Sequence, residues 1–397
     1  MINRKLAVAI VIAGLSFTSC KNEKDENAEG DASENTENMP NMNTAFIGTY
    51  TKKEGHVDGK ADGILTIQQN PETGKIRLGR TVAEVINPSF VKLTSDGKYL
   101  YAVSELGDKD AASGFIHSFQ VKENNSLVEV DKVSTEAFAP CHIEIDKTNK
   151  FAFVSNYMGG VVVMYRIQQD GSLEKHQQLD MPNPKESHTH SVSISADNKH
   201  VYICDLGADK IWIYNFDAKG KTLEKNQQES VSLPEGSGPR HFTFSKDQKF
   251  AYSINELNST ISIFKVEENG GLNLQNSVSS IPEDFTENNS GADIHISPSG
   301  DYLYASNRGH NSIAIFKIDK KSGGLENKGY ASTNGKTPRN FAISEDGRFL
   351  YAANQDSGNI QAYKVNSATG ELDAIGKPTA VPTPVCIEFL KIVPYNE

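Results

Sequence analysis

The sequence predicts an all-β fold: a seven-bladed β-propeller with four antiparallel strands in each blade, closed by pairing of its N- and C-terminal strands. Three observations predict this fold. One strand-turn-strand unit recurs seven times between Pro88 and Cys386. Further strand-like runs separate these units, and no segment has the periodicity of an amphipathic helix. The last unit is incomplete, and a strand-like run near residue 45 supplies what it lacks.

The clearest copy of the unit is a β-hairpin at residues 238–256. Alternating residues lead into a polar turn at residues 245–249, and a second β-rich run leaves it. Equivalent turns recur at residues 94–98, 146–150, 195–199, 297–301 and 344–348. A Tyr or Phe stands at a constant distance after each turn, so the copies align without ambiguity.

A third strand-like run follows each hairpin, and after it come a Gly-rich turn and a fourth run. The third runs are residues 64–67, 116–119, 161–165, 211–214, 261–264, 313–316 and 360–363. Four antiparallel strands in about 50 residues are typical of a propeller blade and not of a helical repeat.

Seven inner strands mean seven blades, and they are expected to begin at Pro88, Pro140, Thr189, Pro239, Gly291, Pro338 and Pro384. The last of them has no hairpin partner before the chain ends. Residues 45–50 match the second strand of the repeat. We therefore expect one blade to be built from both termini, which removes the free sheet edges that otherwise promote aggregation.

The N-terminus has the pattern of an export signal. Arg4 and Lys5 precede an apolar run at residues 6–15, which is too short to span a bilayer, and small polar residues follow. The stretch before Cys20 resembles a bacterial lipobox, although Phe17 stands where an aliphatic residue is usual. We expect residues 1–19 to be a signal peptide. An ordinary secretory leader with a chance Cys is the alternative.

Residues 20–43 are expected to be a lipidated Cys20 followed by a disordered acidic tether, because they are polar and have no periodic apolar face. The acidic start of this tether resembles signals that send some Bacteroidetes lipoproteins to the cell surface. The propeller domain is expected at residues 44–397. The protein would then be an exported outer-membrane or cell-surface lipoprotein, otherwise periplasmic, that contacts membrane only through the lipid on Cys20.

The formal net charge of -11 argues against nucleic acid as a partner. We expect the protein to be a monomer. Only Cys141, Cys204 and Cys386 remain in the predicted domain. An odd number without CxxC spacing does not indicate a disulfide framework. We expect all three to be small buried residues, with Cys141 kept as a weak candidate nucleophile because its position lies at the predicted channel mouth.

The ligand site of a propeller lies at a mouth of its central channel, where the inner strands converge. The position five residues before the turn Ser and the position eleven after it are expected to lie opposite each other at the open end of the hairpin, sharing one face. The first position holds Ser89, Cys141, His190, Arg240, Ala292, Arg339 and Val385. The second holds Tyr50, Glu105, Tyr157, Leu206, Glu256, Arg308 and Gln355.

Three arginines on these two rings suggest an anionic ligand, because a guanidinium group binds carboxylate or phosphate through paired donors. Glu256 can then act as a general base or orient a water molecule, and His190 can share that role near neutral pH. The alternative is that Glu105, Glu256, Arg240 and Arg308 pair with one another and only satisfy charges in a wet hub.

The roles predicted for the other histidines are less specific. His188 and His190 lack a convergent acidic or thiol partner, so no metal site is predicted. His241, His295 and His310 lie one or two places from the mouth positions and are expected to support neighbouring side chains or to pack.

At these residues the sequence resembles the lactonase family of seven-bladed propellers, which includes bacterial 6-phosphogluconolactonase and the fungal 3-carboxy-cis,cis-muconate lactonizing enzyme. The likeness covers about residues 44–391. Its motifs are residues 238–241, 255–257, 294–298, 306–313, 338–341 and 353–355. The site proposed for the lactonizing enzyme is, in chain order, a His, an Arg, a Glu and an Arg. Here that order is met by His190 (or His188), Arg240, Glu256 and Arg308.

The resemblance implies hydrolysis or closure of a lactone that bears an anionic group, with no cofactor. Catalysis would involve Glu256, His190, Arg308 and Arg240, and the substrate would also contact Arg339, Glu105, His188, Tyr157 and Gln355. An exported protein does not suit a cytosolic sugar-phosphate step, so an extracellular sugar or uronate-derived lactone is equally open. The second hypothesis is a non-catalytic propeller that binds an extracellular anionic ligand, glycan or protein at the same mouth.

Overall fold

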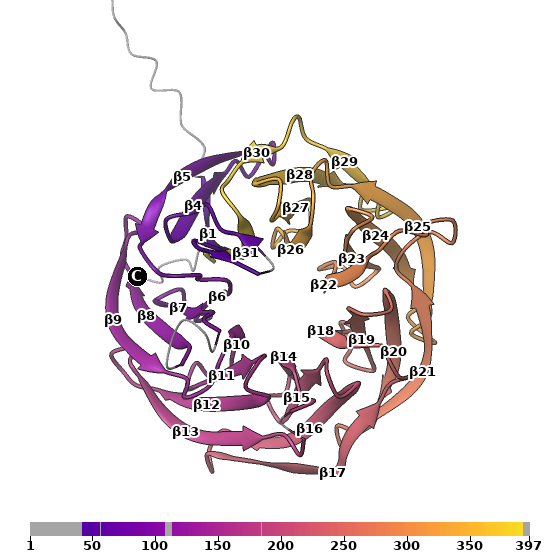
Figure 1. Cartoon of the computed structure of the whole chain (residues 1–397). Coiled ribbons are helices and arrows are strands. Elements are labelled where there is room, and N and C mark those ends of the chain that lie inside the picture. Colours follow the sequence, from indigo (N-terminus) through magenta and orange to yellow (C-terminus); the bar gives the residue numbers. More distant parts are fainter. Residues whose placement is uncertain (1–41, 56, 108–112, 184, 392–397) are drawn as a thin grey trace, which may run out of the picture. The chain divides into compact units, whose positions relative to one another are not determined.

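The computed structural model describes residues 42–55, 57–107, 113–183 and 185–391. Their strands form seven antiparallel sheets arranged around a channel, as the sequence predicts (Figure 1). None of the described residues forms a helix long and apolar enough to cross a membrane. The predicted signal peptide, Cys20 and almost all of the predicted tether lie outside the described residues.

The strands of each blade follow one another from the channel outwards (Figure 1). The blade made from both termini contains β31 (Pro384–Phe389), β1 (Asn43–Thr49), β4 (Ile64–Gln69) and β5 (Ile76–Ala83). The next three blades contain β6 (Val91–Leu93), β7 (Tyr99–Ser104), β8 (Phe115–Val121) and β9 (Leu127–Ser134); β10 (Pro140–Ile145), β11 (Phe151–Asn156), β12 (Val161–Ile167) and β13 (Leu173–Asp180); and β14 (Thr189–Ile194), β15 (His200–Asp205), β16 (Lys210–Asp217) and β17 (Thr222–Ser232).

The last three blades repeat this arrangement. They contain β18 (Pro239–Phe244), β19 (Phe250–Asn255), β20 (Thr260–Val266) and β21 (Leu272–Ser279); β22 (Ser290–Ile296), β23 (Tyr302–Arg308), β24 (Ser312–Ile318) and β25 (Leu325–Ser332); and β26 (Pro338–Ile343), β27 (Phe349–Asn354), β28 (Asn359–Val365) and β29 (Leu372–Ala374), with β30 (Thr379–Ala380) also pairing with β28. A separate small hairpin joins β2 (Lys53–Glu54) to β3 (Val57–Asp58).

In five blades the aromatic residue after the hairpin turn is a Tyr that bonds to the neighbouring blade. The hydroxyl of Tyr252 donates a hydrogen bond of 2.9 Å to the carbonyl of Gly323, which lies in the Gly-rich turn of the next blade. Gly323 has φ +73, a conformation that glycine adopts without strain. Equivalent bonds join Tyr101 to Gly171, Tyr202 to Gly270, Tyr304 to Gly370 and Tyr351 to Gly74. The repeated Tyr and the Gly-rich turn therefore bond to each other across the blade interface.

The first and last strands close the ring. β1 lies between β31 and β4, and Ile47 pairs with Ile387 in an antiparallel ladder. Both side chains belong to a buried cluster that also contains Tyr351 and Ile360 of the preceding blade. The prediction that the strand at residues 45–50 joins the strand that begins at Pro384 is confirmed.

A β-bulge at the open end of the inner hairpins corrects the predicted pairing. Pro239 pairs with Asn255 and His241 with Ile254, so Arg240 has no cross-strand partner and does not lie opposite Glu256 in the ladder. Cys141, His190, Arg339 and Val385 occupy the same unpaired position in their own strands. A bulge interrupts the alternation of side chains and redirects the extra residue. Here Arg240 and His241, although adjacent in sequence, both line one small cavity in the channel.

One inner strand is shorter than expected. β6 begins at Val91 and not at Pro88. The carbonyl of Pro88 accepts a hydrogen bond of 2.9 Å from the backbone N–H of Thr49 at the end of β1.

Candidate active site

Three of the predicted site residues form one ion cluster. Oε2 of Glu256 lies 3.0 Å from Nε of Arg240 and 2.8 Å from Nη2 of Arg308. Burial raises the pKa of Glu256, but Arg308, Arg240 and Arg339 outweigh it and hold the pKa below its ordinary value. The carboxylate is therefore ionised at neutral pH, and the two positions predicted to share a face do share it.

Arg240 is the most deeply buried member of this cluster, with only 2% of its surface exposed. Burial, followed by the neighbouring charges of Arg308 and Arg339, lowers its pKa to about 10. The guanidinium group still carries its charge at neutral pH. Its Nη1 donates to the carbonyl of Ala292 at 2.5 Å, and the equivalent anchor of Arg308 is a bond of 2.9 Å from Nη2 to the carbonyl of Gly291.

Several guanidinium nitrogens at the mouth have no partner among the described residues. Nε of Arg308 is buried without a hydrogen bond, and no described residue bonds to Nη2 of Arg240. The guanidinium group of Arg339 makes no hydrogen bond or ion pair with a described residue and lies 5.6 Å from the centre of the Tyr50 ring. Buried or half-buried donors of this kind suit an anionic group from outside the chain.

His190 lies against the same cluster. It is 4% exposed, and its ring meets those of Tyr157 and His241 edge to face, with centroids 5.8 and 5.4 Å away. Its Nδ1 has no hydrogen-bond partner among the described residues. Burial and then Arg240 lower the pKa of His190 well below its ordinary value, so the imidazole is neutral at pH 7.

His188 occupies a different environment. Its Nδ1 lies 2.9 Å from the carbonyl of Tyr157, and its ring stacks on the Tyr157 ring with centroids 4.6 Å apart. His188 precedes β14 and lies outside the bulge that carries His190. Of the two histidines left open by the sequence, His190 is therefore the one that packs on His241, which in turn contacts Arg240.

The other predicted contact residues are distributed around the mouth. Glu105 accepts a hydrogen bond of 2.8 Å from the hydroxyl of Tyr50, and it lines a cavity of about 10 Å³ together with Arg240 and Arg339. Gln355 is 4% exposed; its Nε2 donates to Asp356 at 2.8 Å, while its Oε1 has no partner among the described residues.

The idea that Cys141 acts as a nucleophile is wrong. Burial raises the pKa of this thiol, which is 6% exposed, and its Sγ donates to the carbonyl of His190 at 3.3 Å. A protonated, buried thiol is a poor nucleophile. Cys204 and Cys386 are likewise buried and free. Within the described ranges, no group of three or more His, Cys, Asp or Glu side chains could hold a metal ion.

Sequence reasoning missed Asp293, which lies one residue further along the repeat than the mouth position. The same step places His142, His241 and Asn340 beside it, and all four line a channel cavity of about 660 Å³. The signal was present: these polar residues share one repeat position in their blades. Strict alternation assigned that position to the blade interior, whereas the bulge turns it towards the channel.

Comparison with known proteins agrees with this fold. The family model described as lactonase, 7-bladed beta-propeller, matches residues 44–389. A 6-phosphogluconolactonase of Formosa agariphila is 35% identical over 313 residues, which cover 75% of this chain and 85% of the relative. A 6-phosphogluconolactonase of Bacillus subtilis is 30% identical over 359 residues, covering 87% of this chain and 97% of the relative.

A solved structure is also similar. The periplasmic gluconolactonase of Pseudomonas aeruginosa superposes with a TM-score of 0.82 at 28% sequence identity, over 89% of this chain and all of the other. The family match spans nearly the whole propeller, and the sequence relatives cover at least three quarters of the chain. The chain therefore belongs to the lactonase family of seven-bladed β-propellers.

Proposed function

We propose that this protein hydrolyses a lactone that carries an anionic group, and that the reaction takes place at the mouth formed by Arg240, Glu256 and Arg308. The observation that carries the proposal is the set of guanidinium donors, around one ionised carboxylate, that have no partner among the described residues. A cluster that only balanced its own charges would leave fewer such donors buried. Membership of the lactonase family supports the same reaction class.

In the proposed reaction, Arg339 and Nη2 of Arg240 bind the anionic group and Arg308 faces the lactone carbonyl. The oxygen of a water molecule attacks the carbonyl carbon, and its proton passes to a base on the protein. Negative charge develops on the carbonyl oxygen, where a preorganised guanidinium donor stabilises it. The bond to the ring oxygen then breaks, and that oxygen takes a proton to give the open hydroxy acid. A strained lactone needs little more than positioning and one base.

Glu256 is the proposed group that orients and deprotonates the water. Its Oε2 is occupied by the two arginines, and no described residue bonds to its Oε1. His190 is neutral, and no described residue bonds to its Nδ1, so we propose that it relays the proton to the leaving oxygen without retaining it. Tyr157, His188, Glu105 and Gln355 are proposed to contact the rest of the substrate.

The substrate is proposed to be a sugar-type lactone, phosphorylated or bearing a carboxylate. Two curated relatives are named 6-phosphogluconolactonase, whereas the Pseudomonas protein is named a periplasmic gluconolactonase. The second name suits the export signal that the N-terminal sequence predicts.

A panel of lactones tests the proposal, with ring opening followed by a pH indicator and spontaneous hydrolysis subtracted. The panel contains 6-phosphogluconolactone, unphosphorylated gluconolactone, a uronate-derived lactone and simple γ- and δ-lactones. We expect turnover of at least one sugar lactone, fastest for an anionic one. Inactivity on the whole panel, combined with binding of phosphate that Arg240→Ala abolishes, would instead support a non-catalytic binding propeller.

We also propose that the protein is exported and anchored by a lipid on Cys20. Replacement of Cys20 by alanine is expected to move the protein from the membrane fraction to the soluble fraction, because lipid attachment requires the thiol. Fractionation with immunodetection measures this shift. Cys386→Ala serves as the control, since that thiol is buried in the propeller and should not change the distribution. Retention of the Cys20 variant in membranes would contradict the anchor.

A further inference from the structure

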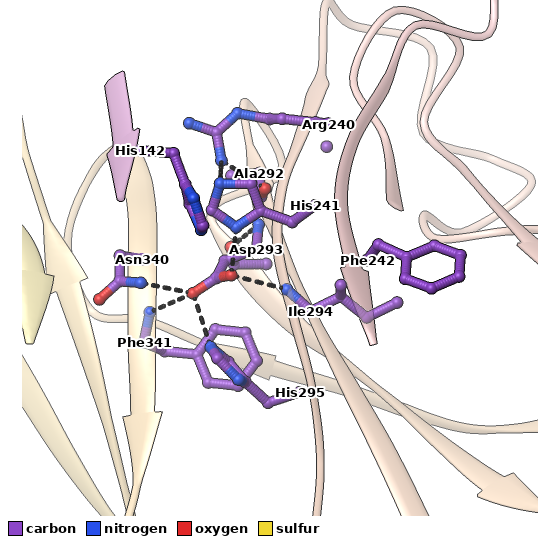
Figure 2. A network of polar contacts seen from close by, with 12 residues as sticks. His142, Arg240, His241, Phe242, Ala292, Asp293, Ile294, His295, Asn340 and Phe341 are labelled. Atoms are coloured by element: carbon purple, nitrogen blue, oxygen red, sulfur yellow. Dashed lines mark hydrogen bonds and ion pairs between the residues drawn. The ribbon is translucent and has the colours of Figure 1, made fainter. Parts of the chain in front are cut away.

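Asp293 is the centre of a buried polar network just inside the mouth (Figure 2). Asp293 is 1% exposed, and both of its carboxylate oxygens accept hydrogen bonds. Oδ1 lies 2.7 Å from Nδ1 of His241, while Oδ2 lies 2.9 Å from Nε2 of His295 and accepts a bond of 2.6 Å from Nδ2 of Asn340. The backbone N–H groups of Ile294 and Phe341 complete the set at 2.9 and 3.2 Å.

The two neighbours of His241 determine its tautomer. An ionised carboxylate only accepts hydrogen bonds, so Nδ1 of His241 must donate to Asp293. A guanidinium group only donates, and Nη1 of Arg240 lies 3.1 Å from Nε2 of His241. Nε2 must therefore be the unprotonated acceptor, and the imidazole is neutral. Burial and then Arg240 also lower the pKa of His241 to about 4, which agrees with a neutral ring.

The three nitrogens of the Arg240 guanidinium group therefore have different surroundings. Nη1 is held from inside the channel by His241 and by the carbonyl of Ala292, and Nε faces Glu256. Nη2 points away from the network (Figure 2). Without the inner anchor, repulsion by Arg308 and Arg339 would favour other positions for a long, flexible cation.

His295 balances the charge of Asp293 without touching Arg240. Its side chain is 43% exposed, towards the channel cavity of about 660 Å³ that it lines. Burial lowers the pKa of His295, but Asp293 outweighs this effect and raises it above its ordinary value. Asp293 therefore favours protonation of the imidazole on its far side, whereas the imidazole beside Arg240 stays neutral.

We infer that Asp293 and His241 are positioning residues that fix Arg240 in its anion-binding orientation, Asp293 by setting the tautomer of His241 and His241 by accepting a hydrogen bond from Nη1 of Arg240. This inference rests on the proposed role of Arg240 in binding the anionic group. It adds two residues, neither of which touches the substrate, to the proposed active site.

The two histidines provide a matched pair of variants, because each gives one hydrogen bond to the same carboxylate and only His241 reaches Arg240. His241→Phe is expected to lower kcat/KM for the best lactone of the panel about tenfold or more, mainly through KM, as loss of a hydrogen bond to a charged group does. His295→Phe should change kcat/KM less than about threefold, even where it lowers the melting temperature equally. His241→Gln should recover most of the loss, because its amide oxygen can accept from Nη1.

Two measurements do not depend on turnover. Nitrogen-15 NMR of the full-length protein should show His241 at pH 7 as the neutral tautomer with the proton on Nδ1, protonating near pH 4. Titration with inorganic phosphate should show weaker binding for His241→Phe than for His295→Phe. If no lactone is hydrolysed but these two results hold, the proposed reaction fails and the positioning role stands. A proton on Nε2 of His241, or equal losses in the two Phe variants, would overturn the inference.

Discussion

Replacement of Glu256 by glutamine is expected to lower kcat/KM for the preferred lactone by about 100-fold or more, the range typical of a lost general base. The substitution keeps the shape of the side chain and removes its charge. Glutamine cannot deprotonate water, and it leaves three guanidinium groups without the carboxylate that now bridges two of them. Initial rates across a range of substrate concentrations measure the effect.

Glu105→Gln is the matched control for this variant. Glu105 is another carboxylate of the same mouth, but it bonds to the hydroxyl of Tyr50 and not to Arg240 or Arg308. Its loss should raise KM and keep kcat within about tenfold, as expected for a group that only contacts substrate. Equal losses of kcat in both variants would contradict the assignment of Glu256 as the base. Circular dichroism should show the propeller intact in both proteins.

The pH dependence of the proposed reaction in the wild-type protein follows from the same cluster. Arg308, Arg240 and Arg339 keep the pKa of Glu256 below 4.5 despite burial. The carboxylate is therefore still ionised where an ordinary glutamate takes up protons, and the midpoint of the acid-side fall in kcat/KM that Glu256 causes should lie below 4.5. In the Glu256→Gln variant, the loss of activity relative to wild type should be constant wherever the wild-type carboxylate is ionised and should shrink at lower pH, where the wild-type carboxyl group is protonated as well.

The fold could be predicted from the sequence because its signals are local and repeated. Six blades repeat the same polar turn with an aromatic residue after it. In five of them this residue is a Tyr that bonds to the Gly-rich turn of the next blade. The closing strand at residues 45–50 could be assigned because it matches one specific strand of that repeat. The strand β6 was predicted too long: it begins at Val91, and the carbonyl of Pro88 bonds to Thr49 of the neighbouring blade, a contact that the repeat alone does not show.

The site could be predicted in part, and the β-bulge accounts for the rest. Arg240, Glu256 and Arg308 occupy repeat positions that also meet in space. Asp293 was missed because side-chain alternation places it in the blade interior, whereas two residues of β22, Ala292 and Asp293, are unpaired in the ladder. The protonation state of His241 depends on its neighbours from adjacent strands and blades, which no pattern along one strand contains.

Closure of the ring makes the fold depend on one short C-terminal strand, β31. β31 pairs with β1 through Ile387 opposite Ile47, and the backbone N–H of Ile387 donates to Oδ1 of Asn340 at 2.9 Å. β31 thus supplies a ladder, part of a buried cluster and a bond to the neighbouring blade. Without it, β1 becomes an exposed inner edge of a hydrophobic sheet, which is a template for aggregation.

Truncation after Thr383, which removes β31, is therefore expected to abolish folding and yield insoluble or protease-sensitive protein. Ile387→Ala should cost about 2–5 kcal/mol in the free energy of unfolding, the usual range for such a core truncation, and leave a folded ring with a lower melting temperature. Truncation after Lys391 retains β31 and serves as the control. Soluble expression, circular dichroism and thermal melts compare the three proteins. A cooperative melt at the full-length temperature without β31 would show that the ring is stable with one blade incomplete, contrary to the closure that the pairing of Ile47 with Ile387 indicates.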